Sequence, residues 1–340
     1  MDKETLKEYG FELDSYSVVG TAEEGKMAMD AALISSPNTG IPVEYLTFFD
    51  NRAIDVLTAK RAANEVFNEY KAGTRADLVR KFRVVEGTGY TQPYSDYSDN
   101  GKSDVNYNYP MRENYLFETV ITYGDQEVAE TSKAKVNLVA DKQRKAALNI
   151  AIDMNRFYLF GVDGLENYGI LNAPNLPAAI QAAATGTGSS RSWDNKTGAL
   201  IYDDIVALLK NMAARGEGHI DTNTKLKLVV GSAPYANLIK QNSLGNETVI
   251  AMIKRALPNL EVVVVPEYDG LPALGGGTTN KIQLIAVDVD GEPTGELCFS
   301  EKLVAGRVVP YLSHYGQKFM AGTYGAVVYR PVFVSTMIDV

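Results

Sequence analysis

Cysteine, histidine and long apolar runs are scarce in this sequence. Its 340 residues include one cysteine, Cys298, and two histidines, His219 and His314. A single thiol forms no internal disulfide, and three such residues do not supply the ligands of a Cys/His metal cluster. The sequence also lacks a run of about 18 apolar residues that would span a bilayer, and the charged and apolar regions of a secretion signal. We therefore expect no metal, no cofactor and no membrane segment, synthesis in the cytoplasm, and a buried Cys298 that acts as a small hydrophobe.

Positive charge is scarce as well. The formal net charge is -9 and the isoelectric point is about 5.0. Such a chain has no general basic surface with which to neutralise phosphates, which disfavours direct nucleic-acid binding but is compatible with the wall of a DNA container. Hydrophobic residues make up 45% of the chain and charged residues 22%, which indicates a globular protein with one large core or two smaller ones.

Motifs that carry chemistry are absent. The segment 158–174, YLFGVDGLENYGILNAP, has glycines at 161, 164 and 169, but they follow a predicted helix, whereas a phosphate loop precedes one. We interpret them as a glycine-rich helix exit. The spacing G-x-S-x-G does not occur, and DVDG at 288–291 lacks the later ligands of a calcium loop, so it predicts a hairpin turn. The sequence therefore predicts a protein that is not an enzyme.

Two helices are predicted in the first half. Apolar residues at helical spacing predict a helix over 51–72, capped by Asp50 and stopped by Gly73. The strongest helix covers 137–161, with Asn137 as its cap; its second half is apolar all round and must be buried. Residues 1–50 mix short motifs with turn residues and predict an arm.

The region between these helices has a different composition. Two strand-like stretches, 82–86 and 115–123, flank a polar centre rich in Gly, Asn and Asp, which predicts a long two-stranded excursion. From Glu86 to Glu130 nine acidic residues face two basic ones, Lys102 and Arg112. The excursion has too few aliphatic residues for a core, so it is either disordered or laid against another molecule; an internal sheet folded back on its own body is the alternative. Tyrosines favour a contact with another molecule, and seven of the chain's 20 lie here, at 90, 94, 97, 107, 109, 115 and 123.

A second unit begins near Trp193 and has an α/β pattern. It predicts, in order, a helix ending at Gly216, a strand from Lys225, a helix capped by Ser232, a helix stopped by Pro258 and a buried strand over 260–267. The stretches 281–289 and 296–299 are expected to pair across the turn DGEPTG. The tail is rich in strand residues, so we expect the C-terminal segment to lie within a sheet.

This order of elements resembles the major capsid proteins of tailed bacteriophages with the Hong Kong 97-type fold. The most specific stretches are 84–110, 158–174 and 321–334. The resemblance implies an α+β, Hong Kong 97-like capsid fold. It would have an N-terminal arm (1–50), an extended E-loop (82–128), a P-domain (51–81, 129–192 and 306–340, with a spine helix at about 133–160) and an α/β A-domain (193–305).

The resemblance also implies a function. Subunits would self-assemble as pentamers and hexamers into an icosahedral shell that encloses double-stranded phage DNA without sequence-specific binding. The protein would then form the virion capsid, assembled in the host cytoplasm, with portal and possible decoration proteins as partners. Residues 1–50 are too short and too little heptad-patterned for a scaffolding coiled coil, which favours a separate scaffold protein. An encapsulin-like nanocompartment shell is the alternative, and a soluble α/β enzyme is a third interpretation.

The acidic excursion suggests how subunits would meet. We hypothesise that it docks on basic flanks of the adjacent subunit, so that assembly depends on salt. The candidate contact residues are Tyr94, Tyr97, Asp99, Lys102, Tyr107 and Tyr109 on the excursion, and Arg80, Lys81, Lys133, Lys135 and Lys142 on the flanks. Some relatives crosslink subunits through lysine; Lys102 could do so, but with no reaction partner identified a solvated lysine is the favoured interpretation.

Overall fold

The computed structural model describes residues 60–97, 100–221, 223–241, 247–270 and 279–340, all of which belong to one compact unit, 55–340. The predicted arm, the first part of the predicted helix over 51–72, and Asp99 lie outside the described residues. Within the described part of the chain, no helix is long and apolar enough to cross a membrane. There is likewise no group of three or more His, Cys, Asp or Glu side chains there that is placed to hold a metal ion.

The long helix α5 is the centre of the first half of the fold. It covers Leu138–Phe160, and the side chain of Asn137 accepts a hydrogen bond from the amide of Ala140 at 3.2 Å, so the predicted helix and its cap are confirmed. The helix ends at Gly161, whose φ of 69° suits a residue without a Cβ. A second helix, α4 (Asp125–Lys133), precedes it and was not predicted. The two are separate because the chain turns at Lys135, which has a φ of 59°.

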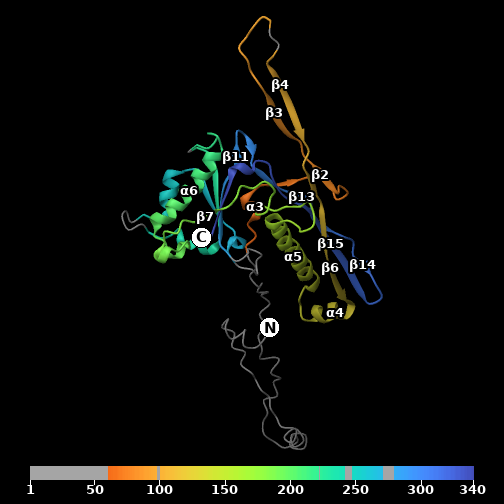
Figure 1. Cartoon of the computed structure of the whole chain (residues 1–340). Coiled ribbons are helices and arrows are strands. Elements are labelled where there is room, and N and C mark those ends of the chain that lie inside the picture. The colour runs from red at the N-terminus through yellow and green to blue at the C-terminus, as the bar shows by residue number, and fades with distance from the viewer. Residues whose placement is uncertain (1–59, 98–99, 222, 242–246, 271–278) are drawn as a thin grey trace, which may run out of the picture. The chain divides into compact units, whose positions relative to one another are not determined.

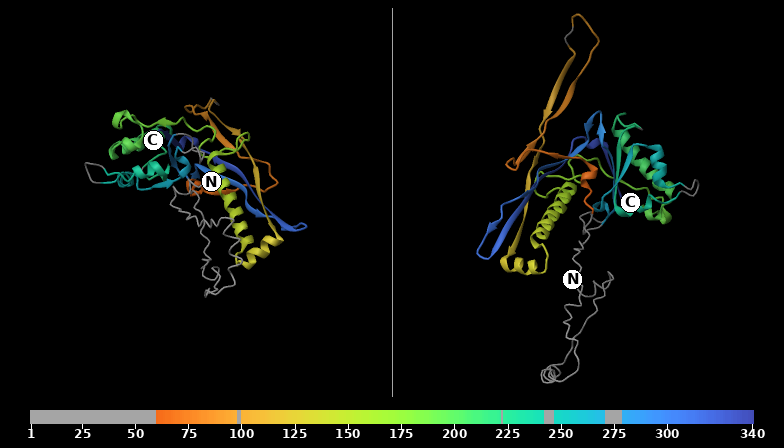
Figure 2. Two further views of the ribbon diagram at one scale, coloured as in Figure 1. Left: turned by 90° about the horizontal axis from the view of Figure 1, so that it is seen from below. Right: turned by 180° about the vertical axis from the view of Figure 1, so that it is seen from behind.

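A five-stranded sheet packs against α5 (Figures 1 and 2). It consists of β1 (Glu69–Lys71), β13 (Gly295–Ala305), β15 (His314–Val328), β14 (Val309–Pro310) and β6 (Tyr115–Gly124). One face of β6 and β15, including Ile121 and Phe319, joins Ile150 and Met154 of α5 in a buried core. This sheet, here called the spine sheet, is built from three distant parts of the chain.

The predicted helix over 51–72 is wrong in its described part. Only α3 (Ala63–Val66) is helical, and the chain then enters β1, which pairs in parallel with β13. Tyr70 lies opposite Cys298 in that pairing, so a contact with a strand more than 200 residues away overrides the local helical pattern.

The second sheet confirms the predicted α/β unit. It consists of β7 (Ile180–Gln181), β16 (Val334–Ile338), β10 (Lys281–Ala286), β8 (Leu226–Val230) and β9 (Leu260–Val264). Its helices are α6 (Gly198–Arg215), α7 (Ser232–Asn237) and α8 (Val249–Ala256). Short 3-10 turns occur at Thr187–Ser189, Trp193–Asn195, Pro266–Tyr268 and Pro331–Phe333. A separate buried core packs between this sheet and its helices, so the described part of the chain has two main cores. The pairing of β16 with β10 confirms that the C-terminal segment lies within a sheet.

Two details of the α/β prediction are wrong. The stretch 281–289 does not pair with 296–299, because β10 lies between β8 and β16 whereas β13 enters the spine sheet. Only a small hairpin, β11 (Asp288–Val289) with β12 (Glu292–Pro293), forms at the predicted turn.

The predicted cap of α7 is also wrong. Gly231 is the N-cap, and the carboxylate of Asp269 accepts hydrogen bonds from the amides of Ser232 at 2.9 Å and Ala233 at 3.0 Å. A side chain from a distant loop therefore satisfies the free amides that Ser232 was expected to serve.

Candidate subunit interface

The excursion predicted from the sequence contains a two-stranded hairpin. Strand β3 (Val84–Tyr90) pairs antiparallel with β4 (Lys102–Asn108), in a register that runs from Val84 opposite Asn108 to Tyr90 opposite Lys102. Every residue of both strands is exposed, and Figure 1 shows no helix or further strand on either face of the hairpin. The two stretches first expected to form the strands do not pair with each other, since 115–123 belongs to β6 of the spine sheet.

The tip of the hairpin presents tyrosines. Tyr94 is 91% exposed and Tyr97 is 100% exposed. A hydrogen bond with Asp96 raises the pKa of the Tyr94 hydroxyl. On the strand side, Tyr107 and Tyr109 are more than half exposed, and Lys102 opens β4 with an exposed side chain. These predicted contact residues are therefore all open to another molecule.

The base of the hairpin is fixed to the body by two arginines. Strand β2 (Val79–Lys81) pairs with β5 (Met111–Glu113), and Arg80 lies opposite Arg112. The guanidinium of Arg80 donates hydrogen bonds to Cys298 Sγ at 2.5 Å and to the Tyr329 hydroxyl at 3.1 Å. Burial raises the pKa of Cys298 to about 11, so the thiol is neutral at pH 7, which fits the expected small buried side chain.

Arg112 completes this anchor from the other strand. It is 5% exposed, and its guanidinium lies 4.9 Å from the ring centre of Tyr168 and 5.8 Å from that of Phe82. Burial lowers its pKa. Arg80 had been grouped with the residues that face a neighbour, but its guanidinium, like that of Arg112, is directed into its own subunit. Sequence reasoning missed the anchor because Cys298 and Tyr329 lie more than 200 residues away.

The predicted basic flanks fall into two separate places. Lys142 is engaged within the chain, since its ammonium donates hydrogen bonds to Glu127 Oε1 at 2.7 Å and to the Thr122 carbonyl at 2.9 Å. Lys133 and Lys135 are exposed at the end of α4 and in the turn after it, and have no ion-pair partner among the described residues. Lys81 is exposed in β2, which pairs with β5. The ten-residue strand β6 follows β5 and leads to α4, so Lys81 lies at the opposite end of β6 from Lys133 and Lys135 (Figure 1).

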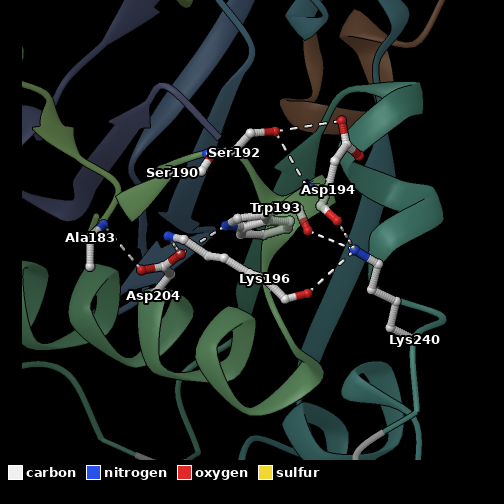
Figure 3. Close-up of polar contacts among 8 residues, drawn as sticks. All are labelled: Ala183, Ser190, Ser192, Trp193, Asp194, Lys196, Asp204 and Lys240. Atoms are coloured by element: carbon white, nitrogen blue, oxygen red, sulfur yellow. Dashed lines mark hydrogen bonds and ion pairs between the residues drawn. The ribbon is translucent and has the colours of Figure 1, made fainter. Parts of the chain in front are cut away.

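A different polar cluster joins α6, which contributes Asp204, to the segment just before it (Figure 3). Asp204 Oδ2 accepts hydrogen bonds from Lys196 Nζ at 2.6 Å and from Trp193 Nε1 at 2.9 Å. Lys240 Nζ donates to the carbonyls of Trp193 at 2.7 Å and of Asp194 at 3.0 Å. Lys196, Asp204 and Trp193 are each at most 3% exposed, so the cluster is closed to substrates and serves to hold the segment before α6 in place. No local motif in the sequence indicated it.

The two sheets, the long helix and the anchored hairpin define a class of protein. The structure is similar to the capsid of Myoviridae phage XM1, with a TM-score of 0.71 and 15% identity over 88% of this chain and 99% of that one. It is also similar to the capsid of a native GTA particle, with a TM-score of 0.61 and 11% identity over 86% and 95% of the two chains. A virus-like particle from Pyrococcus furiosus is similar as well, with a TM-score of 0.52 and 12% identity over 81% of this chain and 92% of that one. At these identities the likeness concerns the fold, which is the expected α+β, Hong Kong 97-like capsid fold.

The family is established by the sequence itself. The model of the Pa193 gp26 major capsid protein family matches residues 32–339, so the chain belongs to that family. It is a phage major capsid protein, which is the structural protein of the head shell, and the encapsulin-like alternative receives no better support. No curated protein matches the sequence.

Proposed function

We propose that this major capsid protein assembles as pentamers and hexamers into an icosahedral shell around double-stranded DNA, and that the β3–β4 hairpin of each subunit reaches onto a neighbour. The exposure of the hairpin carries this proposal, because neither strand has a buried residue. An isolated two-stranded hairpin is marginally stable in water. A second copy that covers it in the shell supplies the packing that its own chain does not.

The proposal assigns the parts of the subunit as the resemblance suggested, with two changes at the boundaries. The hairpin lies within the E-loop (82–128), and α5 lies within the P-domain. Strand β13, within the A-domain range 193–305, belongs with the P-domain because it pairs with β15 and β1. Strand β16, within the P-domain range 306–340, belongs with the A-domain because it pairs with β10.

Charge contributes to the contact at the tip of the hairpin. Of the nine acidic residues between Glu86 and Glu130, four lie between Val84 and Asn108, and Asp96 is in the described part of the tip. Of the predicted basic flanks, the exposed lysines Lys81, Lys133 and Lys135 are the groups that would receive such acidic residues on an adjacent copy. Such exposed pairs are screened by salt, so assembly should weaken as ionic strength rises.

Shortening the hairpin tests the main proposal. Replacement of residues 87–105 by Asn-Gly keeps the pair Glu86–Asn106 and closes it with a favoured two-residue turn. We expect the variant subunit to fold, with the wild-type circular dichroism spectrum, and to form no shells in negative-stain micrographs or sedimentation. Shells of normal size and yield from this variant would contradict the proposal.

Charge reversal tests the tip contact separately. The double variant Lys133→Glu, Lys135→Glu should lower shell yield and remove part of its salt dependence. The control Lys210→Glu, Lys254→Glu makes the same change of charge on exposed positions of α6 and α8. Equal yields from both variants at every salt concentration would rule out an electrostatic contact at Lys133 and Lys135 but leave the hairpin contact standing.

Assembly in the host cytoplasm with a separate scaffold and a portal, with or without decoration proteins, belongs to the same proposal. Its support is the resemblance to tailed-phage capsid proteins. Expression of this chain alone should give few closed shells of uniform diameter, and co-expression with the scaffold should restore them. Uniform, closed shells from this chain alone would show that no separate scaffold is needed.

A further inference from the structure

The register of the β3–β4 hairpin gives it two chemically different faces. Residues directly opposite each other in an antiparallel pair share a face, and neighbours along a strand alternate between faces. One face, here called the smooth face, consists of Val85, Gly87, Gly89, Ser103, Val105 and Tyr107. The other face carries all three charged residues of the two strands, Glu86, Lys102 and Asp104. That face also holds Val84 and Tyr90, so the two faces differ in charge, with every charged side chain of the two strands on one of them.

The smooth face is uncovered in the subunit. Val85 is 52% exposed, Val105 is 42% exposed and Tyr107 is 56% exposed. An apolar sheet face of this kind is stabilised when it packs against another surface. Arg83, two residues before Val85, lies over the Tyr107 ring with its guanidinium carbon 5.7 Å from the ring centre. The ring is thus held by its own chain, which lowers the entropy lost when a partner covers it.

Gly87 is the most informative residue of this face. A Cβ added there would meet no atom within 4 Å, and its φ is not in the left-handed region, so its own chain has no need for a glycine. Gly89 differs, because an added Cβ would lie 2.7 Å from the Lys102 carbonyl oxygen. A glycine inside a strand weakens it and often marks the close approach of another backbone. Gly87 therefore leaves this part of the smooth face open to the close approach of another surface.

We propose that the smooth face of the hairpin sits directly on a second copy of this chain, whose surface approaches most closely at Gly87, while the charged face remains in solvent. This rests on the proposed docking of the hairpin and specifies its orientation. A second copy is the occupant because the family builds a shell from many copies of one chain, and because both strands are uncovered in their own subunit. Electrostatic contact then belongs to the tip, and packing to the smooth face of the stem.

Thiol accessibility at two adjacent positions tests the orientation. Val105→Cys places a thiol on the smooth face, and Asn106→Cys places one on the charged face. The native Cys298 is 0% exposed and serves as the background. In unassembled subunits both introduced thiols should react with a maleimide. In shells the reaction at position 105 should slow by about tenfold or more, since interface cores exclude solvent, while the rate at position 106 stays within about twofold. Equal protection, or protection at 106 alone, would overturn the proposal.

Added volume provides an independent test. Gly87→Leu and Thr88→Leu introduce the same side chain at neighbouring positions on opposite faces. Gly87→Leu should leave the thermal melt of the unassembled subunit unchanged and reduce shell yield by about tenfold or more, as expected at the centre of an interface. Thr88→Leu should assemble like the wild type.

The outcomes of these tests separate the two proposals. If the shortened hairpin still forms normal shells, the docking of the hairpin is wrong. If the shortened hairpin fails to assemble but Gly87→Leu and Thr88→Leu behave alike, docking stands and the assigned face is wrong.

Discussion

The hairpin stem exposes apolar side chains and the cluster around Asp204 buries charged ones, which is the reverse of the usual distribution between surface and interior. In the cluster, Lys196 and Asp204 are buried, and each finds its hydrogen-bond partners within the chain. In the stem, Val85 and Val105 are exposed and have no covering layer. Buried charges are costly unless they are fully paired, whereas an exposed apolar face is useful where another molecule will cover it. The cluster belongs to the part of the subunit that must hold itself together, and the stem is the part that the proposed docking places on a neighbour.

Breaking the buried ion pair between Lys196 and Asp204 should cause the largest loss of stability. Lys196→Ala leaves Asp204 buried without its counter-charge, which should lower the free energy of unfolding by about 3–5 kcal/mol. The control Lys225→Ala removes the exposed pair with Asp288, at 3.5 Å, and should cost about 0–1 kcal/mol. Urea unfolding of the unassembled subunit measures both. Similar losses for the two variants would show that the Asp204 cluster is not a structural centre.

Truncation of an apolar side chain should cost much more stability in the α/β core than on the hairpin. Leu228 in β8 is fully buried, so Leu228→Ala should cost about 2–5 kcal/mol in the unassembled subunit. Val105→Ala on the hairpin should change the free energy of unfolding by less than about 0.5 kcal/mol, because nothing covers it there. The same urea titrations apply. A loss above 1 kcal/mol for Val105→Ala, as a rough threshold, would indicate that the hairpin packs on its own chain.

A smaller effect on stability should come from the buried carboxyl of Glu267, and it should depend on pH. Glu267 is 5% exposed; its Oε1 accepts a hydrogen bond from Asn155 Nδ2 at 2.6 Å, while its Oε2 has no hydrogen-bond partner among the residues that the structure describes. Burial raises its pKa above the ordinary value of 4.5. Because the folded pKa exceeds the unfolded one, the stabilising contribution of this carboxyl is complete below pH 4.5 and is lost as pH rises through the folded value.

Glu267→Gln removes this titration. Its stability relative to the wild type should therefore increase from pH 4.5 upward, as measured by urea midpoints in a series of buffers. Glu261→Gln, at an exposed position of β9, is the matched control and should follow the wild type. If the difference between Glu267→Gln and wild type is independent of pH, the buried carboxyl does not titrate in the folded protein.

Local signals in the sequence account for part of this fold. The helix α5 and its Asn137 cap were predictable because periodicity and capping act within a few residues. The region after α3 was not, because β1 is formed by pairing with β13. The cap of α7 was assigned to Ser232, whereas the carboxylate that serves it comes from Asp269. Each error involves a partner distant in the sequence.

In the candidate interface, too, local features were predictable from the sequence and contacts with distant residues were not. Composition alone indicated an excursion that lacks a core, and the tip tyrosines are exposed as that implies. It did not indicate which residues form the strands, because the polar centre rich in Gly and Asn contains most of the hairpin pairing. The inward direction of Arg80 also depends on Cys298 and Tyr329, which no pattern near residue 80 could identify.

The position of β16 also constrains the order of events during synthesis. This strand covers Val334–Ile338 and lies between β7 and β10, so the α/β sheet remains divided until the ribosome has released the chain as far as Ile338. Until then β10 keeps an open edge, which the nascent chain must protect from mispairing. The hairpin at 84–108 emerges much earlier. Completion of the α/β sheet therefore waits for the translation of β16, long after the hairpin has emerged from the ribosome.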